Sequence, residues 1–275
     1  DLSVCKISDQ RPLSMRHRAI AFPAEPEPGF VNTGKEKIVV VGMDFADSPG
    51  TGTPKAAIDE IVKNSTEWIN WYSREKLTWD FVTYDKWIRA PKESQVLDVA
   101  EVGADAQITR EIKEEYVSEI QKVVNVEKTA AFWVIYPEDI QKIVAVGQNR
   151  QWYPIQTKDG VIAPAMFAIG KETYESRRTP WLYLVHETLH AQGLAGHSPF
   201  MPPVMGGIMN FDDSPTHYLN AWEASTLDWA EPSDTYCVEL EKLTKTLITL
   251  VPIEREQKGI SSVMIKLDSH RVLVV

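Results

Sequence analysis

Three histidines and a glutamate lie close together around residue 190, with a spacing that suits metal chemistry. The segment reads His186-Glu-Thr-Leu-His-Ala-Gln-Gly-Leu-Ala-Gly-His197. Residues four apart on a helix share one face, so His186 and His190 can bind one metal ion. Glu187 points beside that metal, where a general base accepts a proton from the water that the metal activates. Histidine ligands with one position open for water are typical of catalytic zinc.

Local sequence signals predict that both histidines lie on one helix. Thr179-Pro180 is typical of a helix start, because threonine caps helices and proline is favoured at the first helical position. Leu182, Val185 and Leu189 then form an apolar stripe at helical spacing. Gly193 predicts the helix end, because glycine adopts the left-handed conformation freely. The chain is therefore expected to turn just after His190.

Two histidines on a helix do not complete a zinc site, so a third ligand is needed from the residues after the turn. His197 is the predicted third ligand, since the turn at Gly193 can bring it back to the metal. In the alternative, His197 is an ordinary loop residue, and Asp212 or Asp213 completes the site.

The motif resembles the metzincin branch of zinc-dependent metallopeptidases, whose pattern is H-E-x-x-H-x-x-G-x-x-H; here the third histidine comes one residue later. The resemblance implies a methionine turn beneath the zinc, which matches Met209 within residues 207–211, and a methionine there gives the imidazole rings an apolar floor. A plain core methionine is the alternative. Phe211 carries no hydroxyl, so transition-state helpers would be His217 or Tyr218, unless these two residues only cap or pack.

A finer resemblance is to the immune-inhibitor-A-like branch of secreted metallopeptidases. The residues that carry it are Leu219-Asn-Ala-Trp222, Leu227-Asp-Trp229, Leu250-Val-Pro252 and Asp44-Phe45-x-Asp47. It implies a zincin-type catalytic domain, in which a mixed twisted sheet accompanies the active-site helix. Calcium is common in such proteins, and the pairs Asp44/Asp47 and Asp212/Asp213 are the acidic candidates; solvated or capping acids are the plainer interpretation.

The pattern along the chain predicts an α+β fold in three parts. Residues 1–36 are expected to form an extended arm across the surface, 37–234 the catalytic domain, and 235–275 a small all-β module. The strands are expected at 38–42, 79–84, 130–136, 161–169, 238–240, 246–251, 262–267 and 271–275, and the helices at 56–73, 108–124 and 214–230, besides the zinc helix. Pro164 suits a sheet edge. The resemblance implies that an edge strand pairs with the substrate backbone, and residues 163–167 are the candidates because they are close in sequence to the zinc helix.

Composition restricts the possible partners. The chain has 275 residues, a net charge of −10 and 43% hydrophobic residues, which is typical of a globular protein. The acidic charge argues against nucleic acid and against an anionic membrane surface. No apolar run approaches the length of a membrane span. A protein or peptide substrate is therefore the expected partner.

The two cysteines, Cys5 and Cys237, either form one long-range disulfide or remain two free thiols. A protease outside the cytoplasm favours the disulfide, and we expect a secreted or cell-surface location. No signal peptide is visible, so the chain from Asp1 is interpreted as a mature form. Because Val275 falls within an apolar strand, we expect further domains of a longer chain.

The function expected from these patterns is that of a secreted zinc-dependent endopeptidase, with zinc held by His186, His190 and His197 and with Glu187 as the general base. One alternative is a catalytically silent protease-fold module of a cell-surface or assembly protein. Another is a zinc hydrolase that acts on a bond other than the peptide bond.

Overall fold

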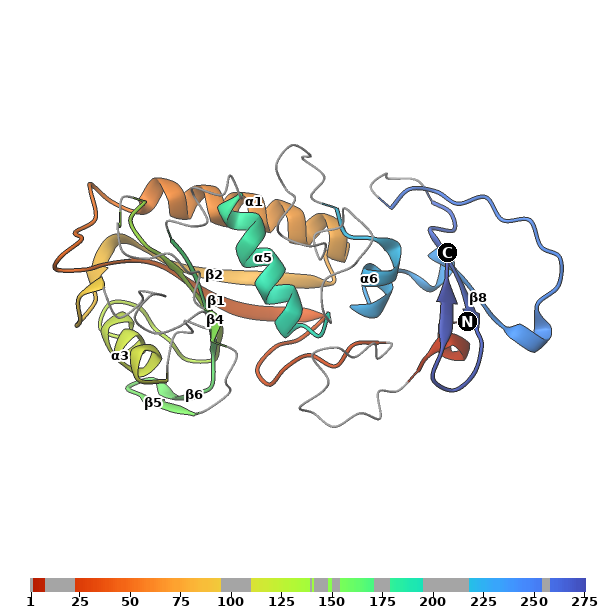
Figure 1. Cartoon of the computed structure of the whole chain (residues 1–275), viewed down its shortest axis with the longest axis horizontal. Helices are drawn as coiled ribbons and strands as arrows, with labels where there is room; N and C mark the ends of the chain where they lie inside the picture. Colours follow the sequence, from red (N-terminus) through yellow and green to blue (C-terminus); the bar gives the residue numbers. More distant parts are fainter. Residues whose placement is uncertain are drawn as a thin grey trace.

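The computed structural model describes residues 2–7, 23–94, 110–138, 140, 148–149, 154–170, 179–194, 218–253 and 258–275. A larger lobe contains a five-stranded sheet with helices, and a smaller lobe contains a three-stranded sheet (Figure 1). The fold is therefore α+β, with a mixed sheet and a separate small sheet, as the sequence predicted. None of the described helices has the length and apolar character needed to cross a membrane.

The five-stranded sheet has the order β2-β1-β3-β7-β4. Its strands are β1 (Gly34–Asp44), β2 (Leu77–Arg89), β3 (Thr129–Ile135), β7 (Ala165–Ile169) and β4 (Gln148–Asn149). The first four run parallel, whereas β4 pairs antiparallel to β7 at the edge. Strands β3 and β7 are buried along their whole length, which explains their uninterrupted apolar sequences.

Helices cover both faces of this sheet. Helices α1 (Lys55–Ser73) and α5 (Pro180–Ala191) pack on one face and contact each other (Figure 1), and α3 (Arg110–Ile120) packs on the other. The two-residue period of β1 divides its side chains accordingly: Ile38 and Val40 belong to the core under α1 and α5, whereas Val39 and Val41 belong to the core under α3. A hairpin of β5 (Ile155–Thr157) and β6 (Gly160–Ile162) lies beside α3.

The prediction of a substrate-binding edge at residues 163–167 is wrong. Pro164 separates β6 from β7 and does not mark a sheet edge. Strand β7 pairs with β3 along its length and with β4 at Met166 and Phe167, so it is not an edge strand of the sheet. The edge position is taken by β4 instead.

The smaller lobe is built around a three-stranded sheet whose first strand begins at residue 235. Strands β8 (Thr235–Glu239), β9 (Ser262–Lys266) and β10 (Val272–Val274) form a sheet in the order β10-β9-β8. The short helices η5 (Pro232–Asp234) and η6 (Leu240–Lys242) flank β8. The predicted strand at 246–251 does not form: Leu247 is 98% exposed, and one isolated bridge joins Leu250 to Ile260. An alternating apolar pattern does not form a strand by itself, because a strand also needs a neighbouring strand to share its backbone hydrogen bonds.

Helix α6 (Ala221–Thr226) is shorter than the predicted helix at 214–230. Asn220 starts it with a capping box, in which the Asn220 side chain accepts from the backbone N–H of Glu223, and the Glu223 carboxylate accepts from the backbone N–H of Asn220. It ends at Leu227, and Asp228 then takes the left-handed conformation. Residues 214–217 lie outside the described residues.

The described parts of the N-terminal arm are more buried than the surface arm that the sequence predicted. Its first helix, η1 (Leu2–Cys5), lies against β8 and β9, and a disulfide joins Cys5 to Cys237, so both chain ends lie in the smaller lobe (Figure 1). Further on, Phe30 is buried in the same core as α5. The arm is buried there because backbone bonds hold it between α5 and α6, from Glu27 N–H to the Ala191 carbonyl and from Ala24 N–H to the Thr226 carbonyl.

Candidate metal centre

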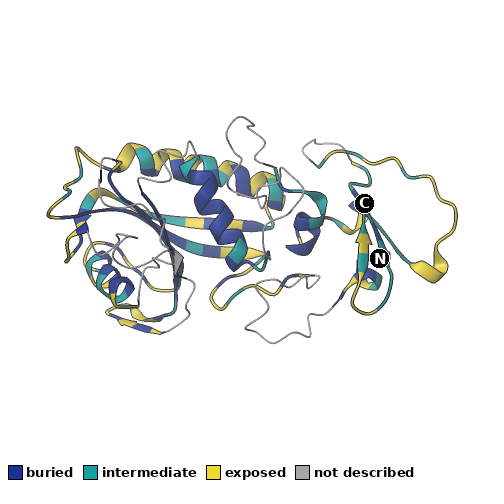
Figure 2. Cartoon of the chain, in the orientation of Figure 1, coloured by how far each residue is buried: buried dark blue, intermediate teal, exposed yellow. Residues whose placement is uncertain are grey.

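Helix α5 carries the histidine motif and is buried along most of its length, as Figure 2 shows. It begins after Thr179, with Pro180 at its first position, as the sequence predicted. It ends at Ala191, and Gly193 follows with φ of +100°. The Leu194 N–H bonds back to the Leu189 carbonyl at 3.1 Å, which closes a glycine-dependent helix end.

The turn at Gly193 also has no room for a side chain. A Cβ atom there would lie 2.7 Å from the carbonyl oxygen of Glu25 and 2.9 Å from the Cβ of Ala24. The arm therefore packs directly against the turn that ends α5. Glycine is required here both by the positive φ and by this close approach.

His186 and His190 lie on consecutive turns of α5. Their ring centroids are 4.7 Å apart and their planes are nearly perpendicular, at 88°. His186 is buried, with 2% of its surface exposed, and His190 is half-buried. The structure thus brings together the two imidazole rings that the spacing predicted to face one metal ion.

The hydrogen bond of His190 fixes which of its nitrogens can bind a metal. Its Nδ1 lies 2.9 Å from the carbonyl oxygen of Leu194. A carbonyl only accepts, so Nδ1 carries the hydrogen and donates it, which leaves the lone pair on Nε2. Metal-binding histidines are usually oriented in this way by a carbonyl or carboxylate. The orientation of the His190 ring therefore suits the role of a zinc ligand.

Glu187 is the other titratable residue of the motif on α5. Its side chain is 1% exposed. One residue along a helix corresponds to a rotation of about 100°, so the carboxylate lies beside the face of His186 and not on it. This is the position expected of a proton acceptor next to a metal ion.

A buried hydrogen bond joins α5 to the centre of the sheet. The indole nitrogen of Trp133 on β3 donates to the Thr188 hydroxyl oxygen at 3.1 Å, and that hydroxyl donates to the Leu184 carbonyl at 2.8 Å. The Trp133 ring packs edge-on against Trp79 on β2, with centroids 5.5 Å apart. Because Thr188 lies between the two histidines in sequence, this contact fixes the rotation of α5 that presents them.

A second buried group lies at the C-terminal end of α5. The Glu36 carboxylate accepts from Val31 N–H at 2.9 Å, from Trp79 Nε1 at 2.9 Å and from Gln192 Nε2 at 3.1 Å. Burial raises the pKa of Glu36 to about 7, although these three hydrogen bonds act to lower it.

Sequence reasoning missed Glu36, because it lies between Lys35 and Lys37 and resembles a surface residue. The strand period was the available signal. Glu36 is two residues before Ile38 and four before Val40, so it shares their buried face.

The other predicted site residues differ in how far they can be placed. His197, Met209, His217, Asp212 and Asp213 lie outside the described residues. Tyr218 is described, half-buried, two residues before the cap of α6. Within the described part of the chain, no group of three or more His, Cys, Asp or Glu side chains forms a metal site.

The acids proposed for calcium at the end of β1 are engaged by protein groups. Asp44 accepts from the Arg89 guanidinium at 2.8 and 2.9 Å and from Gly50 N–H at 2.8 Å. Asp47 accepts from the backbone N–H and the hydroxyl of Ser94, at 2.9 and 2.6 Å. Both carboxylates therefore organise the loops around them.

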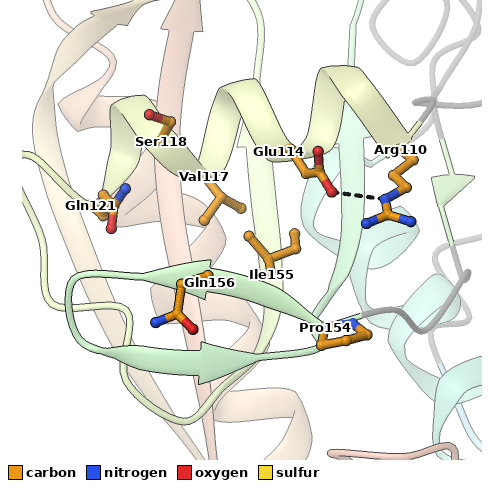
Figure 3. Close-up of a pocket in the computed structure, with 8 residues that line it drawn as sticks. All are labelled: Arg110, Glu114, Val117, Ser118, Gln121, Pro154, Ile155 and Gln156. Carbon is orange, nitrogen blue, oxygen red and sulfur yellow. Dashed lines mark hydrogen bonds and ion pairs between the residues drawn. The ribbon is translucent and has the colours of Figure 1, made fainter.

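A pocket lies on the opposite face of the sheet from α5, between α3 and the β5–β6 hairpin (Figure 3). Its charged residues, Arg110 and Glu114, bond to each other at 2.8 Å. Because the sheet separates it from the histidines, this pocket is not part of the candidate metal centre.

No family model matches the chain, and no curated protein matches it.

Proposed function

We propose that this protein is a secreted zinc-dependent endopeptidase. The observation that carries the proposal is the arrangement on α5: two imidazole rings 4.7 Å apart on consecutive turns, with the buried Glu187 beside them. His186 and His190 would hold zinc, with His197 as the proposed third ligand. The carbonyl contact of His190, which places the hydrogen on Nδ1 and the lone pair on Nε2, supports this assignment.

The chemistry can be assigned to named groups. Zinc, when bound, supplies Lewis-acid chemistry that polarises the substrate carbonyl and makes water more acidic. The Glu187 carboxylate accepts the proton of the attacking water and then donates it to the leaving amine. The low polarity around Glu187, which is 1% exposed, strengthens that proton transfer because bulk water does not compete.

The proposed substrate position is beside β4. The resemblance to zinc metallopeptidases implies that an extended peptide pairs with a sheet edge, and β4 is the antiparallel edge strand of this sheet. Pairing there would align the peptide by its backbone groups and leave sequence preference to side-chain pockets.

The proposed location outside the cytoplasm is supported by the cysteines. Both form the Cys5–Cys237 disulfide, which persists in oxidising compartments. Calcium is not part of the proposal, since Asp44 and Asp47 already have protein partners.

The test compares zinc content and hydrolysis of a fluorescent casein in the wild type and in Glu187→Gln. We expect the variant to retain its zinc and to lose hydrolysis by a factor of at least about 100, the usual contribution of a general base. Glu111→Gln on the exposed side of α3 is the matched control and should hydrolyse normally.

Two outcomes would favour the alternatives. Full activity of Glu187→Gln would exclude the proposed mechanism. A wild-type protein that binds zinc but cleaves no member of a diverse peptide library would indicate a catalytically silent protease-fold module, or a hydrolase of another bond.

A further inference from the structure

We infer that Glu36 is a positioning residue for the proposed zinc site. Its carboxylate holds the end of α5 against the arm and the sheet by hydrogen bonds, and thereby orients the turn that follows His190. This inference rests on the proposed zinc site, because its consequence is expressed in zinc binding.

The Glu36 carboxylate joins three elements that are distant in sequence. One oxygen accepts from Val31 of the arm, and the other accepts from Trp79 of β2 and from Gln192, the residue that caps α5. Glu36 is 4% exposed and Gln192 is fully buried, so water does not substitute for these bonds. A change at Glu36 therefore acts on all three elements at once.

The arm bonds to both α5 and α6, the helices that precede and follow residues 195–217 in the sequence. At α5, Glu27 N–H donates to the Ala191 carbonyl at 2.8 Å, and Gln192 Nε2 lies 3.4 Å from the Val31 carbonyl. At α6, Ala24 N–H donates to the Thr226 carbonyl at 2.7 Å. The proposed third ligand, His197, belongs to the segment between these anchored ends. The arm therefore holds the C-terminal ends of α5 and α6 relative to each other.

The charge of Glu36 decides how tightly Gln192 is held. As a carboxylate, Glu36 accepts all three donors. As a neutral acid it must place its own O–H. The Gln192 amide, whose Nε2 lies 3.1 Å from Glu36, can turn to offer its Oε1, which is buried and has no hydrogen-bond partner among the described residues. Turning the Gln192 amide to accept that proton removes its Nε2 from the Val31 carbonyl. Protonation thus loosens the arm from the helix end.

The surroundings of Glu36 make this change occur near neutral pH. Its three partners are a peptide N–H, an indole and an amide, all neutral. The elements around it carry the titratable residues Glu27, Asp80, Glu187 and His190, and none of these is among the causes of its raised pKa. Burial is the main cause, and the pKa is about 7.

The experiment measures zinc affinity by chelator competition at pH 6 and pH 8, in the wild type and in Glu36→Gln. Glutamine imitates the neutral acid, so the two proteins should bind zinc alike at pH 6. At pH 8 the variant should bind roughly tenfold more weakly, which is the usual loss when an outer partner of a metal site is removed. Titration of the histidines affects both proteins equally and cancels in the ratio.

The matched control is Glu223→Gln. Glu223 is also buried, and burial likewise raises its pKa to about 7, but its described bonds lie within the capping box of α6. Glutamine preserves that cap, so the zinc affinity should equal that of the wild type at both pH values. A deficit of the same size in this control would show that any buried carboxylate has the effect, and would overturn the inference.

A second measurement separates this inference from the proposed function. Hydrogen exchange of the Gly193 and Leu194 amides, followed in the metal-free protein, should be at least threefold faster in Glu36→Gln at pH 8, after correction for intrinsic rates. Gln192→Met, which removes the same contact from the other side, should give the same result and serves if Glu36→Gln does not fold. Unchanged exchange together with unchanged zinc affinity refutes the positioning role. Absence of zinc binding by the wild type refutes the proposed function alone.

Discussion

The indole nitrogen of Trp133 lies 3.1 Å from the hydroxyl oxygen of Thr188, and both side chains are fully buried. This bond connects the central strand β3 to the residue between the two histidines of α5. Replacing Thr188 by valine preserves the shape but leaves the indole N–H without an acceptor. We expect a loss of about 1–3 kcal/mol in the free energy of unfolding, measured by urea denaturation. Thr246→Val, at an exposed position, should change it by less than about 0.5 kcal/mol.

The turn after α5 supports a second prediction. Gly193→Ala would place a Cβ 2.7 Å from the Glu25 carbonyl oxygen at a positive φ. Left-handed strain costs about 1–2 kcal/mol and overpacking about 1–3 kcal/mol, so we expect a combined loss of roughly 2–5 kcal/mol. Gly160→Ala separates the two effects, because its φ is +117° but nothing lies within 4 Å of the added Cβ. Equal losses in the two variants would argue against the close packing of the arm.

The buried carboxyl of Glu36 predicts how stability depends on pH. Its pKa is raised from 4.5 to about 7 on folding, so the folded state holds the proton more tightly than the unfolded state. The resulting stabilisation is complete below pH 4.5 and is lost as the pH rises to 7, by about 3 kcal/mol. Between pH 5 and pH 8, Glu36→Gln should therefore lose less stability than the wild type. The free energy of unfolding of both proteins would be measured by urea titration at pH 5 and at pH 8. If the wild type and Glu36→Gln lose the same amount between these pH values, the raised pKa of Glu36 is contradicted.

Much of the larger lobe could be predicted from local pattern. The apolar run at 130–136 is the buried β3, and the Thr179-Pro180 and Gly193 signals bound α5. These predictions succeeded because each depends on local sequence. A strand buried on both faces has an uninterrupted apolar run, and a helix end has characteristic capping residues. The side-by-side arrangement of His186 and His190 follows from helix geometry alone.

The failures concern features that depend on distant partners. Strand β4 has only two residues and becomes the sheet edge because β7 is beside it. Residues 246–251 have a strand-like pattern, but no long ladder forms there. Glu36 has a charged neighbour on each side, and its burial results from the arm and from Gln192, which are far away in sequence.

Metal analysis of the purified chain by mass spectrometry tests whether α5 holds zinc. The wild type should contain one zinc ion per chain. His186→Ala and His190→Ala should each abolish it, and His197→Ala should abolish or weaken it. A wild-type protein without zinc, or zinc retained in both His186→Ala and His190→Ala, would contradict the proposed metal centre.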